Sequence, residues 1–179
     1  MKHKLRKEIS KTRAIYSEEQ LKQFSEDIFK ILEQTQVFSD AKYILAYYSF
    51  PGEVFTHDFI EKHTKNKIIV LPVVKNDVLV LKEFNGVGKM EKSAFGILEP
   101  VGKEFTDYSK IDLAIVPGMS FDRSLNRLGR GKAYYDSLLP KLAAYLIGIC
   151  FSFQLRENIP FESHDFPMNC VITQDEIIY

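Results

Sequence analysis

The sequence predicts a single α/β domain with a mostly parallel central sheet and helices on both of its faces. Apolar runs without polar alternation, such as residues 43–48, 68–71 and 111–116, are typical of strands covered on both sides. Amphipathic segments with apolar residues at helical spacing alternate with these runs, as in parallel sheets. The 179 residues contain no linker and no internal repeat, so we expect one domain over residues 1–179.

Four helices are expected along the chain. The first covers about residues 3–15, and the second follows the capping-box pattern of residues 17–20 with an apolar stripe from Leu21 to Leu32. The third runs from Thr56, its expected N-cap, to about His63, and the fourth covers about residues 132–143.

Six strands are expected, over residues 43–48, 68–71, 78–81, 111–116, 145–150 and 171–173. Pro72 is expected to end the second strand, and Pro117-Gly118 the fourth. Residues 85–104, which are rich in glycine, predict a long irregular connection.

Composition excludes several classes of protein. The 24 basic and 24 acidic residues cancel, which argues against nucleic acid as a partner. No apolar run approaches the ~18 residues of a membrane helix, and no apolar segment follows the basic N-terminus as in a secretory signal. We therefore expect a cytoplasmic protein with no membrane partner, in which Cys150 and Cys170 are buried free thiols.

The connection after the fourth strand predicts an anion site. Ligands of open α/β sheets bind beyond the carboxyl ends of the strands. Within ten residues this connection carries four cations, and its glycines let the backbone approach a ligand closely: Arg123, Arg127, Gly129, Arg130, Gly131 and Lys132. A helix that starts near Lys132 would add its positive dipole end, and these parts suit a triphosphate.

Neither common phosphate motif fits this loop. A Walker A loop requires glycine at position 126 and Ser or Thr at position 133, which here are Asn126 and Ala133. The dinucleotide pattern that starts at Gly129 meets Tyr134 where it requires glycine. From the residues alone, a solvated basic surface loop remains the alternative. Against it stand two tyrosines and Asp136, which offer a stacking face and a Mg²⁺ ligand.

Four segments together resemble the 5-formyltetrahydrofolate cyclo-ligase family. The longest consists of Pro117-Gly118-Met119-Ser120-Phe121-Asp122 followed by Asn126-Arg127-Leu128-Gly129-Arg130-Gly131-Lys132-Ala133-Tyr134-Tyr135-Asp136. The others are Lys2-x-x-Leu5-Arg6, Glu53-x-x-Thr56 and Gly96-Ile97-Leu98-Glu99-Pro100. They occur in the order of the family and span nearly the whole chain.

The resemblance implies a three-layer α/β/α fold like that of sugar-phosphate isomerases and CoA-transferases. It also implies an enzyme that uses ATP and Mg²⁺ to convert 5-formyltetrahydrofolate into 5,10-methenyltetrahydrofolate, acting as a monomer. By this resemblance the residues at ATP would be Lys2, Leu5, Arg6, Arg127, Leu128, Gly129, Arg130, Gly131, Lys132, Ala133, Tyr134 and Tyr135.

The resemblance implies three further groups of residues. Those at the folate would be Tyr48, Glu53, Arg130, Gly131, Lys132, Ala133 and Tyr134. The catalytic residues would be Arg130, Lys132 and Tyr134, and the Mg²⁺ ligands Asp136 and Asp165. Two positions depart from the family pattern. Ala133 stands where the family has glycine, and the Cβ of alanine would clash if φ at this position is positive. Asn169 or Cys170 stands where an acid is common in the family.

Two other functions remain open from the sequence. A relative of sugar-phosphate isomerases or acyl-CoA transferases would share the fold but would not need the cation-rich loop. A non-catalytic nucleotide- or RNA-binding module would use the loop and its tyrosines, but the neutral net charge and the separate matches at Glu53 and at residues 96–100 count against it.

Overall fold

The central sheet has seven strands, and its five inner strands are parallel. The computed structural model describes residues 1–92, 98–163 and 165–179. The strand order is β12-β11-β9-β6-β1-β2-β3, with antiparallel strands at both edges. Their bounds are β1 Tyr43–Leu45, β2 Ile68–Lys75, β3 Val78–Glu83, β6 Leu113–Pro117, β9 Tyr145–Ile149, β11 Cys170–Ile172 and β12 Ile177–Ile178. The predicted α/β class and mostly parallel sheet are confirmed.

Helices lie on both faces of this sheet. The α-helices are α1 Lys2–Arg13, α2 Glu18–Glu33, α3 Gln36–Asp40, α4 His57–His63 and α5 Tyr134–Leu138, and short 3-10 helices cover η1 Val87–Lys89, η2 Tyr108–Lys110, η3 Leu139–Lys141 and η4 Ser152–Gln154. The predicted start of α2 is confirmed, because the Ser17 hydroxyl accepts from the Gln20 amide and the Gln20 side chain accepts from the Ser17 amide. No helix of the described ranges has both the length and the apolar character to cross a membrane.

Two apolar layers hold the helices to the sheet. In β2, Ile69 and Leu71 face the layer that contains α2, α3 and α4, while Val70 faces the layer that contains α5. Alternate residues of a strand point to opposite faces, so a strand covered on both sides is apolar throughout. Cys150 and Cys170 are free and buried, as predicted, and burial raises the pKa of the Cys170 thiol to about 11.

Pro72 does not end its strand, contrary to expectation. Pro72 pairs with Leu81 inside β2, which continues to Lys75. The carbonyl of Val70 points toward β1 and that of Ile69 toward β3, so the nitrogen of Pro72 points to the β1 side. Because β1 ends opposite Val70, no neighbouring strand requires an amide donor at Pro72.

Two other expectations are corrected. The connection over residues 85–104 contains an antiparallel pair, β4 Met90–Lys92 and β5 Leu98–Pro100. The helix expected over residues 132–143 is only the five-residue α5, followed by the 3-10 turn η3 that contains Pro140. Ala133 is left-handed, so the α-helix cannot begin before Tyr134.

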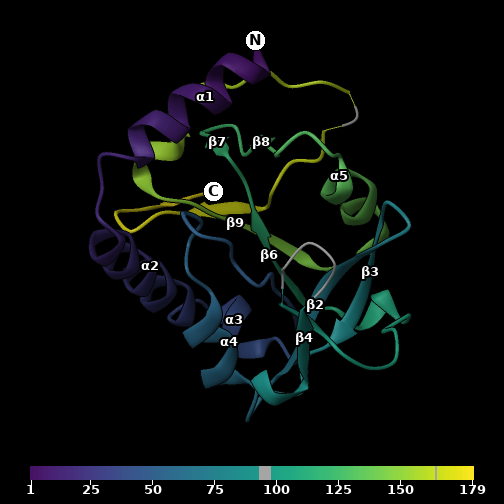
Figure 1. Cartoon of the computed structure of the whole chain (residues 1–179). Helices are drawn as coiled ribbons and strands as arrows, with labels where there is room; N and C mark the ends of the chain where they lie inside the picture. Colours follow the sequence, from purple (N-terminus) through teal and green to yellow (C-terminus); the bar gives the residue numbers. More distant parts are fainter. Residues whose placement is uncertain (93–97, 164) are drawn as a thin grey trace.

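The chain after β6 forms a small second sheet that the sequence reading missed. Its strands are β7 Ser120–Asp122, β8 Arg127–Leu128 and β10 Leu155–Arg156, in the order β10-β7-β8. In Figure 1, α1 lies over this sheet, at the end of β6 that leads into β7. Phe121 is fully buried in β7, against Gly118 and Gly148, where added Cβ atoms would approach its ring to 2.6 and 2.4 Å. The two glycines thus make room for the aromatic side chain that anchors the cation-rich loop.

Candidate active site at the carboxyl edge of the sheet

The candidate site lies at a switch in the order of the strands. From β1 the chain proceeds to β2 and β3 on one side, and then to β6 and β9 on the other. The connections that follow β1 and β6 therefore leave the same edge of the sheet in opposite directions. Such a switch point opens a crevice at the carboxyl ends of the strands, where α/β proteins bind ligands. The predicted site residues of both connections lie here.

The connection after β1 is fixed by Thr56. This residue is fully buried, and its hydroxyl donates to the Tyr47 carbonyl at 2.6 Å and accepts from the Ser49 amide at 3.1 Å. The Thr56 amide donates to the Ser49 hydroxyl at 3.1 Å. Thr56 stands at the N-cap of α4, but its side chain makes no capping bond, so the expected capping role is wrong. The threonine of the Glu-x-x-Thr element instead holds the loop that carries Glu53.

The connection after β6 turns around Asp122. This carboxylate is fully buried and accepts hydrogen bonds from the amides of Ser124, Asn126 and Ile159 and from the Asn126 side chain, at 2.9–3.0 Å. Four donors satisfy a buried charge that would otherwise be costly. Asp122 and Asn126 thus shape the loop, which explains why the family signature extends so far before the cations.

The two connections meet in an ion pair. The Arg130 Nε and Nη2 atoms lie 3.0 and 2.6 Å from Glu53 Oε1. The other oxygen of Glu53 accepts from the Phe50 amide at 2.8 Å, and the Arg130 guanidinium lies over the Phe50 ring, 5.6 Å from its centroid. The Glu53 side chain is 12% exposed and that of Arg130 is 51% exposed. The carboxylate is therefore mostly enclosed, while the guanidinium lies on its solvent side.

A second ion pair lies deeper in the loop. Arg127 has a side chain only 4% exposed, and it donates to Asp136 Oδ1 and to the Pro117 carbonyl. Its guanidinium carbon lies 5.5 Å from the centroid of the Tyr135 ring. The Arg127 Nε and the Tyr135 hydroxyl are buried and have no hydrogen-bond partner among the residues that the structure describes. Arg127 is thus enclosed by protein groups. The four cations expected from the sequence therefore do not form one open cluster.

The other cations of the loop differ in their surroundings. Arg123 forms ion pairs with Glu157 and Glu176, which compensate its charge. Lys132 is exposed, and among the described residues no carboxylate pairs with it. Of the four cations in the sequence pattern, Lys132 and the solvent side of Arg130 are the ones open to a ligand.

Helix α1 lies across both connections. Lys2 Nζ lies 2.7 Å from Asp165 Oδ2 and 3.1 Å from Glu162 Oε1, so the N-terminus is tied to the C-terminal segment. Burial disfavours the charged form of Lys2, but the hydrogen bonds to the two carboxylates outweigh it and raise its pKa. Arg6 Nε donates to the Gly129 carbonyl at 2.8 Å. The predicted ATP residues of the N-terminus therefore lie beside the predicted ATP loop.

Two neighbouring tyrosines, Tyr47 and Tyr48, follow β1 and have different surroundings. Tyr48 stacks on His57 of α4, with ring centroids 3.6 Å apart. The Tyr47 hydroxyl donates to the Val54 carbonyl. Burial is the largest cause that raises the pKa of Tyr47, and the negative charge of Glu53 raises it further. Burial and then Glu53 also raise the pKa of Tyr135. Tyr47, whose pKa Glu53 raises, and Phe50, whose ring lies under Arg130, are not among the residues predicted from the sequence.

The glycine-rich part of the loop has two left-handed residues. Gly131 has φ 102° and Ala133 has φ 54°. The side chain of Leu128 is buried, at 1% exposure, so this residue offers a ligand only its backbone. A non-glycine residue in this conformation is strained by roughly 1–2 kcal/mol. The family's glycine at position 133 thus has a physical cause. Because α5 has five residues, the expected dipole contribution near Lys132 is small.

Ala133→Gly is expected to stabilise the protein. The change relieves the strain at φ 54°. The greater entropy of the unfolded chain offsets part of this gain, so the free energy of unfolding should rise by about 1 kcal/mol. Urea denaturation measures it. Ala14→Gly is the matched control, because Ala14 has φ −66° and should lose about 0.5–1 kcal/mol when replaced. A loss of stability in Ala133→Gly would contradict the strain argument.

Each predicted metal ligand pairs with a cation in the structure. Asp136 pairs with Arg127 and Asp165 with Lys2, and the described residues include no group of three or more His, Cys, Asp or Glu side chains arranged for a metal. His164 and the residues Gly96 and Ile97 of the Gly-Ile-Leu-Glu-Pro segment lie outside the described residues.

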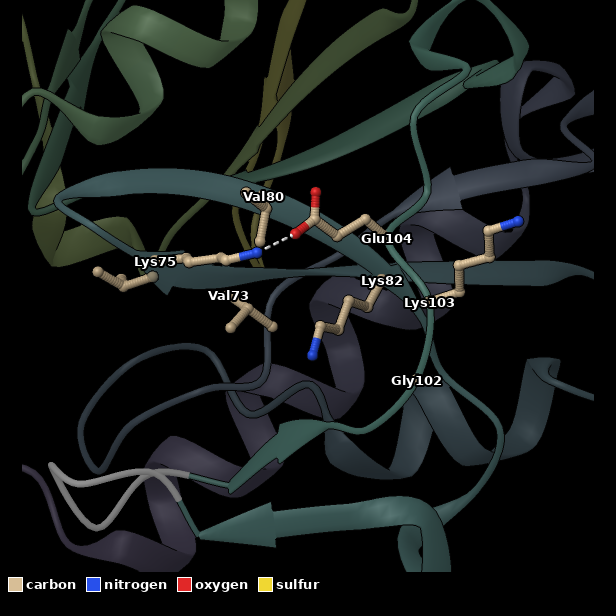
Figure 2. Close-up of a pocket in the computed structure, with 8 residues that line it drawn as sticks. Val73, Lys75, Val80, Lys82, Gly102, Lys103 and Glu104 are labelled. Carbon is tan, nitrogen blue, oxygen red and sulfur yellow. Dashed lines mark hydrogen bonds and ion pairs between the residues drawn. The ribbon is translucent and has the colours of Figure 1, made fainter.

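A separate groove lies on the β2–β3 hairpin. It has a volume of about 510 Å³ and contains none of the predicted site residues; its lining is Val73, Val74, Lys75, Val80, Lys82, Gly102, Lys103 and Glu104. Figure 2 shows the Lys75 ammonium bound to Glu104, at 2.6 Å, while those of Lys82 and Lys103 point away from this pair.

The fold and the site together define an α/β ligand-binding domain with acidic and cationic groups meeting at a switch point. Residues 1–174 match the model of the 5-formyltetrahydrofolate cyclo-ligase family. The chain belongs to this family. It is 29% identical to the mouse (Mus musculus) 5-formyltetrahydrofolate cyclo-ligase, over 97% of this chain and 94% of the relative. It is 30% identical to the Haemophilus influenzae cyclo-ligase, over 93% and 94%.

Solved structures support the same relationship. The Aquifex aeolicus 5,10-methenyltetrahydrofolate synthetase superposes with a TM-score of 0.89 at 32% identity, covering 98% of this chain and 91% of that one. The Mycoplasma pneumoniae 5,10-methenyltetrahydrofolate synthetase superposes with a TM-score of 0.78 at 25% identity, covering 97% and 98%. The shared fold includes the mostly parallel central sheet that carries the site.

Proposed function

We propose that this chain converts 5-formyltetrahydrofolate into 5,10-methenyltetrahydrofolate with ATP, and releases ADP and phosphate, where the connections after β1 and β6 meet. The observation that carries this proposal is the contact between Glu53 and Arg130, which are 77 positions apart. It brings the predicted folate residue into the predicted triphosphate loop. A group bound at Glu53 would therefore lie beside a phosphate bound along that loop.

In this proposal α1 and the loop hold ATP. Lys2, Leu5 and Arg6 approach from the helix, and residues 127–135 from the loop. The contact of Arg6 with the Gly129 carbonyl supports a shared site for these two segments. The buried Arg127 would position Asp136 and the loop backbone, and it would not contact a phosphate directly.

The folate would lie against the connection after β1. The Glu53 carboxylate is a hydrogen-bond acceptor held in place by Arg130 and the Phe50 amide, and it could accept from the amino and ring N–H groups of a pterin. Arg130, Gly131, Lys132, Ala133 and Tyr134 would lie between folate and ATP. The stacking of Tyr48 on His57 directs that ring toward α4, and Phe50, 41% exposed beside Arg130, is a further candidate for covering a flat ring.

The reaction needs activation of a poor leaving group. The formyl oxygen attacks the γ-phosphorus, the bond to ADP breaks, and the oxygen becomes part of a phosphate. N10 then attacks the formyl carbon, loses its proton and closes the ring, and phosphate departs with the electrons of the C–O bond. Phosphoryl transfer depends mainly on positioning and on cations that match the charge of the equatorial oxygens. Arg130, Lys132 and Tyr134 are the groups proposed for that task.

Mg²⁺ fits this site as an ion held partly by the nucleotide. Mg²⁺ usually takes one or two carboxylates and completes its shell with phosphate oxygens and water, so a cluster of three acids is not required. Asp136 and Asp165 would be the carboxylates, and the ion would neutralise charge on the phosphates. Each of these acids forms an ion pair, Asp136 with Arg127 and Asp165 with Lys2.

Absorbance of the methenyl product in the near ultraviolet tests the proposed activity. The purified protein should produce the signal only when ATP, Mg²⁺ and 5-formyltetrahydrofolate are all present. No signal from the folded protein would refute the proposal. Turnover of a sugar phosphate or an acyl-CoA, without ATP, would favour the rival enzyme classes instead.

Asp136→Asn is expected to lower stability as well as activity. The amide removes the negative charge beside the buried Arg127 guanidinium, whose Nε is already without a partner. Loss of a charge-assisted hydrogen bond of this kind costs about 2 kcal/mol of the free energy of unfolding. Urea denaturation without ATP and Mg²⁺ measures this effect separately from metal binding. Unchanged stability would show that Arg127 does not depend on the charge of Asp136.

Three finer expectations belong to this proposal. Free buried thiols at Cys150 and Cys170 support a reducing, cytoplasmic location. A monomeric state would be tested by analytical ultracentrifugation. Likeness to sugar-phosphate isomerases and CoA-transferases is supported only by a mostly parallel sheet with helices on both faces, and superposition on those folds would test it.

A further inference from the structure

Arg13, near the end of α1, holds its guanidinium flat over the loop that carries Glu53. A Cβ added at Gly52 would lie 2.5, 2.6 and 2.7 Å from Arg13 Nη1, Cζ and Nε. The nearly equal distances mean that the flat face of the guanidinium is turned toward Gly52. Gly52 has φ +83° and lacks a side chain, so the loop both turns and makes room for the arginine at this residue.

The guanidinium of Arg13 has no protein acceptor in the described part of the chain. Arg127, Arg130 and Lys2 each pair with a carboxylate there, whereas no ion pair or side-chain hydrogen bond involves Arg13. A guanidinium carries five N–H donors, all in its plane. With its face against Gly52, these donors point along the surface of the loop. The side chain is half-buried, so it is not simply solvated.

Arg13 belongs to the face of α1 that covers the site. Lys2, Arg6, Ile9 and Arg13 follow one another at helical spacing, and Ile9 is 1% exposed. Arg6 lies against Gly129 and Gly131 of the cation-rich loop. Two helical turns separate Arg6 from Arg13, which is about 10 Å along the axis. The same helix therefore places one cation on each of the two connections that form the crevice.

We infer that Arg13 binds an oxyanion group of a substrate in this crevice. The inference rests on the proposed function, which supplies two sources of such a group: the phosphates of ATP and the carboxylates of the folate's glutamate. An arginine with a fixed plane and free donors suits either, because both present paired oxygen atoms. Arg13 thus extends the cationic surface from the loop after β6 to the loop after β1.

Steady-state kinetics of Arg13→Gln test this role. We expect KM to rise about tenfold for one substrate, with little change in kcat, because one charge-assisted contact that forms on binding is lost. A rise for ATP assigns the contact to phosphate, and a rise for 5-formyltetrahydrofolate assigns it to carboxylate. Arg13→Lys should recover part of the loss by keeping the charge without the planar donors.

Lys11→Gln is the matched control, since Lys11 is an exposed cation of the same helical turn. Both variants remove one positive charge from α1. Equal KM values for Arg13→Gln and Lys11→Gln, with both substrates, would overturn the inference. A fall in thermal stability of Arg13→Gln, together with parallel changes in both KM values, would also overturn it. That result would show that Arg13 only stabilises the loop by packing on Gly52. Inactivity of the wild-type protein would instead refute the proposed function.

Discussion

Replacing Lys132 by alanine is expected to lower kcat/KM for ATP by about 100- to 1000-fold, the usual effect of removing one preorganised charge from a transition state. Lys132 lies between Gly131 and Ala133, is exposed, and has no carboxylate partner among the described residues. Its charge is therefore available to the γ-phosphoryl group, whereas those of Arg123 and Arg127 are already compensated. The near-ultraviolet absorbance of the methenyl product, followed at varied ATP concentrations, measures the change.

The fold should tolerate this substitution, because an exposed side chain outside regular structure adds little packing. Lys141→Ala is the control: it removes the same charge from an exposed lysine in η3. Near-normal turnover of a folded Lys132→Ala protein would contradict the role given to Lys132. An equal loss in Lys141→Ala would point to a general effect of charge and not to a contact with phosphate.

Replacing Glu53 by alanine is expected to raise KM for 5-formyltetrahydrofolate by about 100-fold, the equivalent of a lost hydrogen bond to a charged group. The side chain is mostly enclosed and held by the Phe50 amide, so its orientation is fixed before a ligand arrives. ATP affinity should not weaken, because the substitution also releases Arg130 from its ion pair. Isothermal calorimetry with each ligand separates the two effects.

A double-mutant cycle shows whether Glu53 acts on the folate or only on Arg130. Glu53→Gln, Arg130→Gln and the double variant each remove one or both charges of the pair. If Glu53 merely positions Arg130, the two single variants weaken the same ligand and the double variant is no worse. A direct folate contact predicts that Glu53→Gln weakens folate binding even when Arg130 is already replaced. A Glu53→Ala protein with unchanged folate binding would exclude the contact.

Three ion pairs connect the predicted site residues. Glu53 pairs with Arg130, Asp136 with Arg127, and Asp165 with Lys2. Under the proposed function, the folate would replace Arg130 beside Glu53, and the released guanidinium would turn to the phosphates of ATP. This exchange keeps the charge of Arg130 compensated before and after binding, which limits its energetic cost.

Much of the fold could be predicted from local pattern. The capping box of α2 and the apolar strands β1, β6 and β9 depend on contacts between residues near in sequence or on burial of whole runs. Pro72 and the helix over residues 132–143 could not be predicted in this way. Pro72 is accepted because β1 ends beside it, and the helix is short because residue 133 is left-handed.

For the site, the sequence by itself determined which residues are the candidates for the chemistry, since the cations, glycines and Glu53 belong to segments that are recognisable wherever they occur. Only the tertiary structure decided which of those charges are free. The strand order brings Glu53 to Arg130 across 77 positions, buries Arg127 against Asp136, and lays Arg13 on Gly52. Pairing of charges depends on distances across the switch point between β1 and β6, and no local pattern in the chain encodes those distances.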